Sequence, residues 1–146
     1  MAYLYEALRR VKTGKRFILV LKGYVEPPSA LLDKVLVVKE FLPRHVLIEL
    51  YKLADVVVVP SLAEGFGLPI IEAFAAGKPV VSLDAMPMNE LNNEDTGYLI
   101  RVCRQQIVKG WPTSFRLNIP CLDDYVSKLV EAIENEDERY KNLLMH

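Results

Sequence analysis

The sequence has few cysteines and no long apolar run. Its 146 residues contain two cysteines, Cys103 and Cys121, which match no recognisable disulfide framework or metal-ligand spacing. So few cysteines suit a reducing cytoplasm, where one of the two would be simply a buried side chain. No apolar run approaches the roughly 18 residues of a membrane-spanning helix, and we expect no signal peptide. We therefore expect a cytoplasmic protein that associates with a membrane only through a partner, if at all.

An excess of charge of one sign is also missing. The formal net charge is -1, from 18 Lys and Arg against 19 Asp and Glu. This balance does not favour nucleic acid or an anionic membrane as the main partner. What the chain does have is 51% hydrophobic and 25% charged residues, which is typical of a globular protein and not of a disordered one. The length fits one domain, 1–146, that can bury a core.

Apolar runs of strand length alternate with segments of helical spacing. The expected strands are 16–23, 34–41, 55–59, 78–84 and 96–100, and the expected helices are 3–12, 43–54, 69–77 and 123–144, the last with a break near Asn135. The strands are continuously apolar, which is the pattern of burial on both faces. We therefore predict an α/β fold, a Rossmann-like parallel sheet with helices on both faces.

Segment 101–120 does not fit this alternation. Connections in such folds are usually about two to six residues long. The turn at 109–112 is flanked by β-leaning runs, so we predict an inserted hairpin. Trp111 in this turn is interpreted either as an acceptor or partner contact or as a packing residue of the hairpin.

The stretch SLAEGFGLPIIEA, residues 61–73, comes directly after the expected strand 55–59. We place it at the carboxyl end of a central parallel strand, where ligands of open α/β sheets bind. The next helix has Pro69 in its first turn, and Leu68 before it has no side-chain oxygen for the free N–H groups. An anion such as a diphosphate fits these donors and the helix dipole.

Glycines and acids complete this predicted site. Gly65 and Gly67 let the backbone turn sharply and let a ligand approach without meeting a Cβ. Glu72 lies on the helix face of the anion site and leans back toward it, where it would accept hydrogen bonds from a ribose diol. Glu64, on the other rim, would do the same for sugar hydroxyls. Together these groups predict a nucleotide-sugar, although Glu64 as a solvated loop acid and Glu72 as an exposed helix residue stay open.

The stretch PSLAEGFGLPIIEAFAAGKPVV, with TGYLI about twenty residues later, resembles the donor-binding C-terminal domain of GT-B glycosyltransferases. It is most similar to the large retaining family whose two acids are separated by seven residues. The resemblance covers roughly residues 3–100 and rests on Glu64, Gly65, Phe66, Gly67, Leu68, Pro69, Glu72, Ala73, Gly77, Pro79 and Gly97.

The resemblance implies the donor half of a glycosyltransferase, which binds a nucleotide-sugar for glycosyl transfer with retention of configuration. Glu64 would be the catalytic residue that contacts the transferred sugar, and Glu72 would hold the ribose. The nucleobase would lie near Phe41, which has a core position as its alternative. No cofactor and no metal are implied.

The resemblance also assigns the backbone of the loop. Gly65 belongs to the donor-binding loop, and the amides of Phe66 and Gly67 would lie beside the sugar and the phosphate. The amide of Leu68 would bind phosphate.

Two parts of the family pattern are expected to be missing. The first is an arginine and lysine clamp for the diphosphate, which the family carries before its first helix; Lys22 is a weak substitute. The second is the N-terminal acceptor-binding domain, so we expect a separate domain or subunit as partner. The alternative function is a nucleotide-sugar-binding module or interaction subunit with no activity alone.

Five other polar residues have structural interpretations. We interpret His45 as a helix-surface residue, Asn89 and Glu90 as a cap of a short helix facing the donor pocket, and Asp123 and Asp124 as helix capping.

Overall fold

The computed structural model describes residues 1–110 and 112–134. The predicted break near Asn135 and the two interpretations of Trp111 lie outside these residues. The helices are α1 (Ala2–Arg10), the 3-10 turn η1 (Ser29–Leu31), α2 (Arg44–Leu53), α3 (Leu68–Ala75), α4 (Met88–Leu91) and α5 (Leu122–Glu134). The strands are β1 (Leu19–Lys22), β2 (Val35–Val38), β3 (Val57–Val58), β4 (Val80–Leu83), β5 (Gly97–Ile100), β6 (Val102–Val108) and β7 (Phe115–Pro120).

The predicted α/β fold with parallel strands is confirmed, but the parallel strands form two separate sheets. β1 pairs with β2 in one parallel sheet, and β3, β4 and β5 form a second parallel sheet in that order. Ladder hydrogen bonds need neighbouring strands about 4.8 Å apart. Within the described residues no ladder joins the two sheets, where the sequence predicted one continuous sheet.

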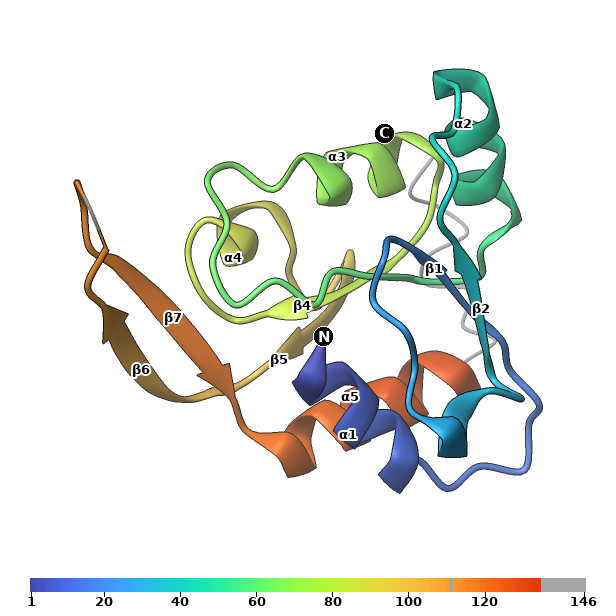
Figure 1. Ribbon diagram of the computed structural model, residues 1–146, viewed down its shortest axis with the longest axis horizontal. Helices are drawn as coiled ribbons and strands as arrows, with labels where there is room; N and C mark the ends of the chain where they lie inside the picture. The colour runs from blue at the N-terminus through green and yellow to red at the C-terminus, as the bar shows by residue number, and fades with distance from the viewer. Residues whose placement is uncertain (111, 135–146) are drawn as a thin grey trace.

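The core lies around β4, with helices on both sides of its sheet. Every residue of β4 is buried, as the continuously apolar run predicted. Helices α3 and α4 lie on one side of this sheet, and α1 and α5 pack against each other on the opposite side (Figure 1). The largest fully buried side chains include Leu4, Ile70, Met88 and Ile100.

The prediction that the strands are buried on both faces is wrong for β1. Its residues alternate between half-buried and exposed, and Val20 is 45% exposed. Leu36 on β2 is likewise 57% exposed, so one face of this two-stranded sheet is open within the described residues. The run of apolar residues predicted the strand correctly, but apolar composition alone does not determine what covers each face.

A buried amide ties α4 to the sheet. Asn92 is fully buried, and its Nδ2 donates to the carbonyl of Val80 at 3.0 Å and to Oγ of Ser82 at 2.9 Å. A Cβ added to Gly97 would lie 2.1 Å from the same Val80 carbonyl. The glycine of TGYLI is therefore explained by the close approach of β5 to β4.

The inserted hairpin is confirmed as β6 paired antiparallel with β7, and it projects from the body of the domain (Figure 1). The interpretation of the cysteines was wrong. Cys103, in an irregular step of the β6 register, forms a disulfide with Cys121, directly after β7. Their Cα atoms are 4.8 Å apart, because the hairpin returns the chain to its own base.

Among the described residues, no helix has the length and the apolar character needed to span a bilayer.

Candidate functional site

The stretch 61–67 belongs to the connection from β3 to α3, so it lies at the carboxyl end of a parallel strand, as predicted. The expectation that this strand is central was wrong for the described residues. β3 is an outer strand of its three-stranded sheet, because its ladder partner is β4 alone. Val59, just beyond β3, is 3% exposed, and the chain emerges from the core at this point.

Gly67 sets the start of α3. It has φ 87° and ψ 37°, the left-handed conformation that glycine adopts without a steric penalty. Its carbonyl accepts hydrogen bonds from the N–H groups of Ile70 and Ile71 at 3.0 and 3.4 Å. Gly67 is therefore the N-cap. The prediction that Leu68 precedes the helix was wrong by one residue, because the left-handed turn brings Leu68 itself into the first turn.

The N–H groups at this helix start have no side-chain cap. Within the described residues the backbone N–H groups of Gly67 and Leu68 donate to no acceptor. The flanking side chains of Phe66 and Leu68 are 62% and 60% exposed. A Cβ at Gly65 would meet no atom within 4 Å, so packing within the described chain does not explain this glycine. Gly67 itself is buried and Leu68 is exposed, so the arrangement offers an accessible backbone donor at Leu68, beside that of Gly67.

Glu64 is half-buried on the loop, where it is held by a neighbouring hydroxyl. Ser61 Oγ donates a hydrogen bond to Glu64 Oε1 at 2.5 Å. The serine lies three residues earlier and opens the same loop, so the carboxylate is oriented locally. Sequence reasoning did not identify Ser61 as a partner, although a hydroxyl residue near an acid in a tight loop is a recognisable signal.

Glu72 belongs to α3, and its carboxylate faces α2. Tyr51 of α2 donates from its hydroxyl to Glu72 Oε2 at 3.0 Å. Burial, and then the hydrogen bond and the charge of Glu72, raise the pKa of Tyr51 to about 12. The phenol therefore stays a donor to the carboxylate at neutral pH. Sequence reasoning did not identify Tyr51. It lies one turn after Leu47 on the half-buried face of α2, and a half-buried tyrosine usually has a hydrogen-bond partner for its hydroxyl.

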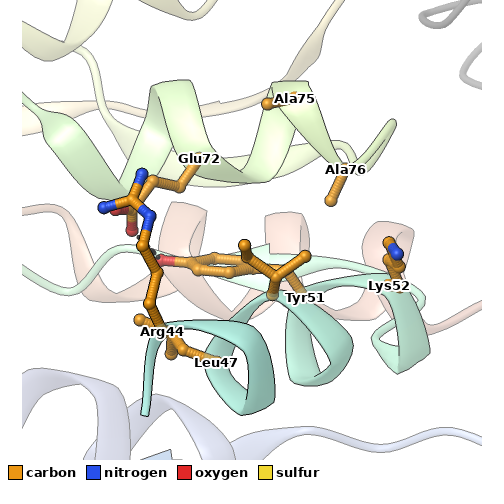
Figure 2. A pocket seen from close by; sticks show the side chains of 8 residues that line it. Arg44, Leu47, Tyr51, Lys52, Glu72, Ala75 and Ala76 are labelled. Carbon is orange, nitrogen blue, oxygen red and sulfur yellow. Dashed lines mark hydrogen bonds between the residues drawn. The ribbon is translucent and has the colours of Figure 1, made fainter.

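A cavity of about 290 Å³ opens beside this pair, between α2 and α3. Figure 2 shows the Tyr51 ring among the side chains that line it and the Arg44 side chain extending toward Glu72. The lining residues are Arg44, Leu47, Ile48, Tyr51, Lys52, Glu72, Ala75 and Ala76. The cavity thus combines one carboxylate, two cationic side chains and an apolar wall, a composition that suits a small polar ligand.

Phe41 is 89% exposed in the connection between β2 and α2, so its interpretation as a core residue was wrong. The reason is that β2 ends at Val38 and the chain has already left the sheet at Phe41. Phe41 precedes Arg44, which lines the cavity, by three residues in the sequence. His45 is exposed on α2, as predicted.

The capping interpretations were only partly correct. Asn89 and Glu90 lie inside α4, whose N-cap is Pro87, and Asn89 Nδ2 donates to Asp84 Oδ1 at 2.9 Å. Asp124 lies in the first turn of α5, where an acid is favourable, but its carboxylate accepts the Arg101 backbone N–H at 2.6 Å.

Within residues 1–110 and 112–134 there is no cluster of three or more His, Cys, Asp or Glu side chains that is suited to a metal ion.

Comparison with known proteins gives a family for this arrangement. The family model for glycosyl transferases group 1 matches residues 1–110, which include the loop, both glutamates and the cavity. The match ends inside the hairpin.

Several curated proteins are similar over shorter stretches. The chain is 42% identical over 60 residues to a D-inositol 3-phosphate glycosyltransferase of Nocardia farcinica, which is 40% of this chain and 13% of that protein. It is 25% identical over 104 residues to an uncharacterized glycosyltransferase of Sulfolobus islandicus rod-shaped virus 1, which is 70% of this chain and 31% of that protein. The aligned part is therefore less than a third of either relative. With the family model matching most of its length, the chain belongs to the glycosyl transferases group 1 family.

Proposed function

We propose that this chain is the donor-binding, C-terminal-type half of a glycosyltransferase that retains the anomeric configuration, and that its ligand is a nucleotide-diphosphate sugar. The observation that carries the proposal is the start of α3. There, the left-handed Gly67 begins the helix in the stretch between Glu64 and Glu72, its N–H and that of Leu68 donate to no acceptor within the described residues, and each carboxylate accepts a hydrogen bond from a hydroxyl.

In this proposal Glu72 binds the ribose. Tyr51 holds Oε2, and among the described residues Oε1 accepts no hydrogen bond, so this second oxygen is available to a diol. A hydrogen bond to a charged group contributes roughly 1.5–3 kcal/mol. Because Tyr51 is neutral and donating, it fixes the carboxylate without neutralising it. The exposed Phe41 would lie against the nucleobase.

The diphosphate would bind at the loop, against the N–H groups of Gly67 and Leu68, with Phe66 and Gly65 bordering the sugar end. Partial positive charge at the start of a helix favours a phosphate there. Lys22 stays a weak candidate for the missing basic clamp.

Glu64 would act at the transferred sugar. In transfer with retention, the bond between the anomeric carbon and the donor phosphate oxygen breaks, and the nucleoside diphosphate leaves. The oxygen of the acceptor hydroxyl bonds to the same face of that carbon, and its proton passes to the departing phosphate oxygen. The leaving group carries the developing negative charge, which the amides of the loop stabilise. Glu64, held by Ser61, positions the sugar hydroxyls during this exchange.

Binding tests the donor half of the proposal. We would titrate the chain with a panel of nucleoside diphosphates and their sugars by calorimetry, and we expect affinities near the millimolar end of the ordinary range, about 1 mM. Replacing Glu72 by Ala should weaken binding of the best ligand by about ten- to a hundred-fold. Glu131→Ala on α5 is the matched control, because Glu131 is a surface carboxylate paired with Lys128. Equal binding by the Glu72 variant and the parent would remove Glu72 from the site.

Activity separates the two forms of the proposal. We expect no measurable transfer from a radiolabelled donor by the chain alone, and transfer when an acceptor-binding domain or subunit is added. Transfer that depends on Glu64 in the presence of that partner supports the enzyme half. Donor binding without transfer under every condition supports the alternative, a binding or interaction module. Robust transfer by the chain alone would contradict the half-enzyme interpretation.

A further inference from the structure

The hairpin β6–β7 contacts the loop that contains Glu64. The backbone N–H of Asn118, on β7, donates to the carbonyl of Leu62 at 2.8 Å. Leu62 lies two residues before Glu64, and Asn118 is 5% exposed. The contact therefore joins a buried position of the hairpin to the beginning of the donor loop.

The register of the hairpin shows why this N–H is available. Asn118 lies opposite Gln105, and in an antiparallel pair successive residues direct their N–H groups alternately toward and away from the partner strand. The N–H of Asn118 points away from β6, toward Leu62. Its side chain is also fixed, because Gln105 Nε2 donates to Asn118 Oδ1 at 2.9 Å.

The base of the hairpin is closed covalently. Cys103 is bonded to Cys121, and the N–H of Cys121 donates to the Arg101 carbonyl at 2.9 Å. Cys121 is 6% exposed and follows Asn118 by three residues. The disulfide thus holds the end of β7 in the place from which Asn118 reaches the loop.

We propose that the disulfide-closed hairpin positions the donor loop, and that opening the Cys103–Cys121 disulfide loosens the loop and weakens donor binding. A dithiol reductant supplies two electrons and two protons, the sulfur–sulfur bond breaks, two thiols form, and the reductant becomes a disulfide. The effect on donor binding rests on the proposed function, whereas the effect on the loop does not.

Amide hydrogen exchange tests whether the hairpin positions the loop, and the measurement needs no nucleotide-sugar. We would compare the oxidised chain, the chain reduced with dithiothreitol, and the Cys103→Ser/Cys121→Ser double variant. Reduction should speed exchange at Asn118, whose N–H donates to Leu62, and at Ile70 and Ile71, whose N–H groups donate to the Gly67 carbonyl at the end of the loop, by about ten-fold or more, and leave β4 unchanged. The double variant should show the fast loop with and without reductant. Unchanged loop exchange on reduction would overturn the proposal, as would an equal rise in β4, because the disulfide would then act on the whole fold.

A second variant tests the link with the disulfide intact. Asn118→Pro removes the N–H that reaches Leu62 and the side-chain hydrogen bond from Gln105, and it removes no ladder bond to β6. Arg116→Pro is the matched control, because Arg116 lies two residues earlier on the same edge of β7 and has no hydrogen bond to the loop within the described residues. We expect fast loop exchange in the Asn118 variant only. Equal exchange in both variants would show that Asn118 does not position the loop.

Titration with nucleoside diphosphates separates the two proposals. If reduction lowers the affinity of the parent several-fold and does not change the affinity of the double variant, both the proposed ligand and the positioning by the hairpin are supported. Loop exchange that responds to reduction, without nucleotide binding in either state, supports the positioning and contradicts the proposed ligand. Binding of equal affinity in both redox states contradicts control of the site by the hairpin.

Discussion

Tyr51 and Glu72 are joined by a hydrogen bond of 3.0 Å across two helices, from the phenol of α2 to the carboxylate of α3. This contact orients the acid that the sequence placed on the helix face of the predicted anion site, with an exposed helix residue as the alternative. It also couples the site to pH, because the phenol can hold the carboxylate only while it keeps its proton.

The first prediction concerns this proton. The folded-state pKa of Tyr51 is raised to about 12, above the ordinary value near 10, so folding favours the protonated form. The stabilisation is complete below pH 10 and is lost as the pH rises through about 12. The difference between the ultraviolet pH titrations of the parent and of Tyr51→Phe should therefore show one tyrosine ionising near pH 12. A difference titration centred near pH 10 would contradict the burial and the contact.

The second prediction concerns two glycines of the loop. Gly67→Ala places a side chain at φ 87°, and its Cβ would lie 3.0 Å from Leu91 Cδ1. Such backbone strain costs of order 1–3 kcal/mol, so the melting temperature should fall by several degrees. Gly65→Ala is the matched control, because its Cβ would meet no atom within 4 Å.

We expect Gly65→Ala to change stability by less than about 0.5 kcal/mol. Thermal unfolding followed by circular dichroism measures both variants. Equal melting temperatures for the two would show that the left-handed turn is not under strain. A loss of nucleotide binding in Gly65→Ala alone would show that Gly65 serves the approach of the ligand.

The third prediction concerns two buried tyrosines. Tyr125 is 2% exposed, and its hydroxyl has no hydrogen-bond partner within the described residues. An unsatisfied buried polar group costs about 1–3 kcal/mol, so Tyr125→Phe should raise the free energy of unfolding. Tyr5→Phe is the control of opposite sign, because the Tyr5 hydroxyl donates to the Val25 carbonyl at 3.2 Å. Urea unfolding of both variants is the measurement, and destabilisation by Tyr125→Phe would show that its hydroxyl is satisfied.

The fourth prediction concerns Phe41. At 89% exposure it contributes little to packing, so Phe41→Ala should leave the free energy of unfolding within about 0.5 kcal/mol of the parent. Stacking of a base on an aromatic ring contributes roughly 1–3 kcal/mol, so the same variant should weaken nucleotide binding by about ten-fold. Leu53→Ala, 78% exposed at the other end of α2, should change neither. Unchanged binding in the Phe41 variant would place the base elsewhere.

Local patterns predicted most of the elements. The run Val80–Leu83 is buried throughout, and glycine after an apolar helix marked the end of α3, where Gly77 has φ 69°. The hairpin was predicted from a single turn flanked by β-leaning runs. These features depend on residues that are close in sequence, so spacing and turn chemistry are sufficient.

Contacts between distant residues were not predictable in the same way. Tyr51 and Glu72 are 21 residues apart, and their contact depends on how two helices pack. The burial of Val20 depends on what covers a sheet face. The disulfide is an intermediate case. Pairing the two strands of the predicted hairpin residue by residue, starting at the turn, would have placed Cys103 and Cys121 together at its base.

The hairpin also leaves one strand edge open. Within the described residues β6 pairs with β7 alone, so every second backbone N–H and carbonyl of β6 faces solvent. Such an edge is a template for pairing with another chain, and charged or strongly polar side chains on the edge strand oppose that pairing. The exposed run Arg104, Gln105 and Gln106 lies in the middle of this edge. The projecting hairpin can therefore contact the loop that contains Glu64 and still resist lateral, fibre-like association with other copies of the chain.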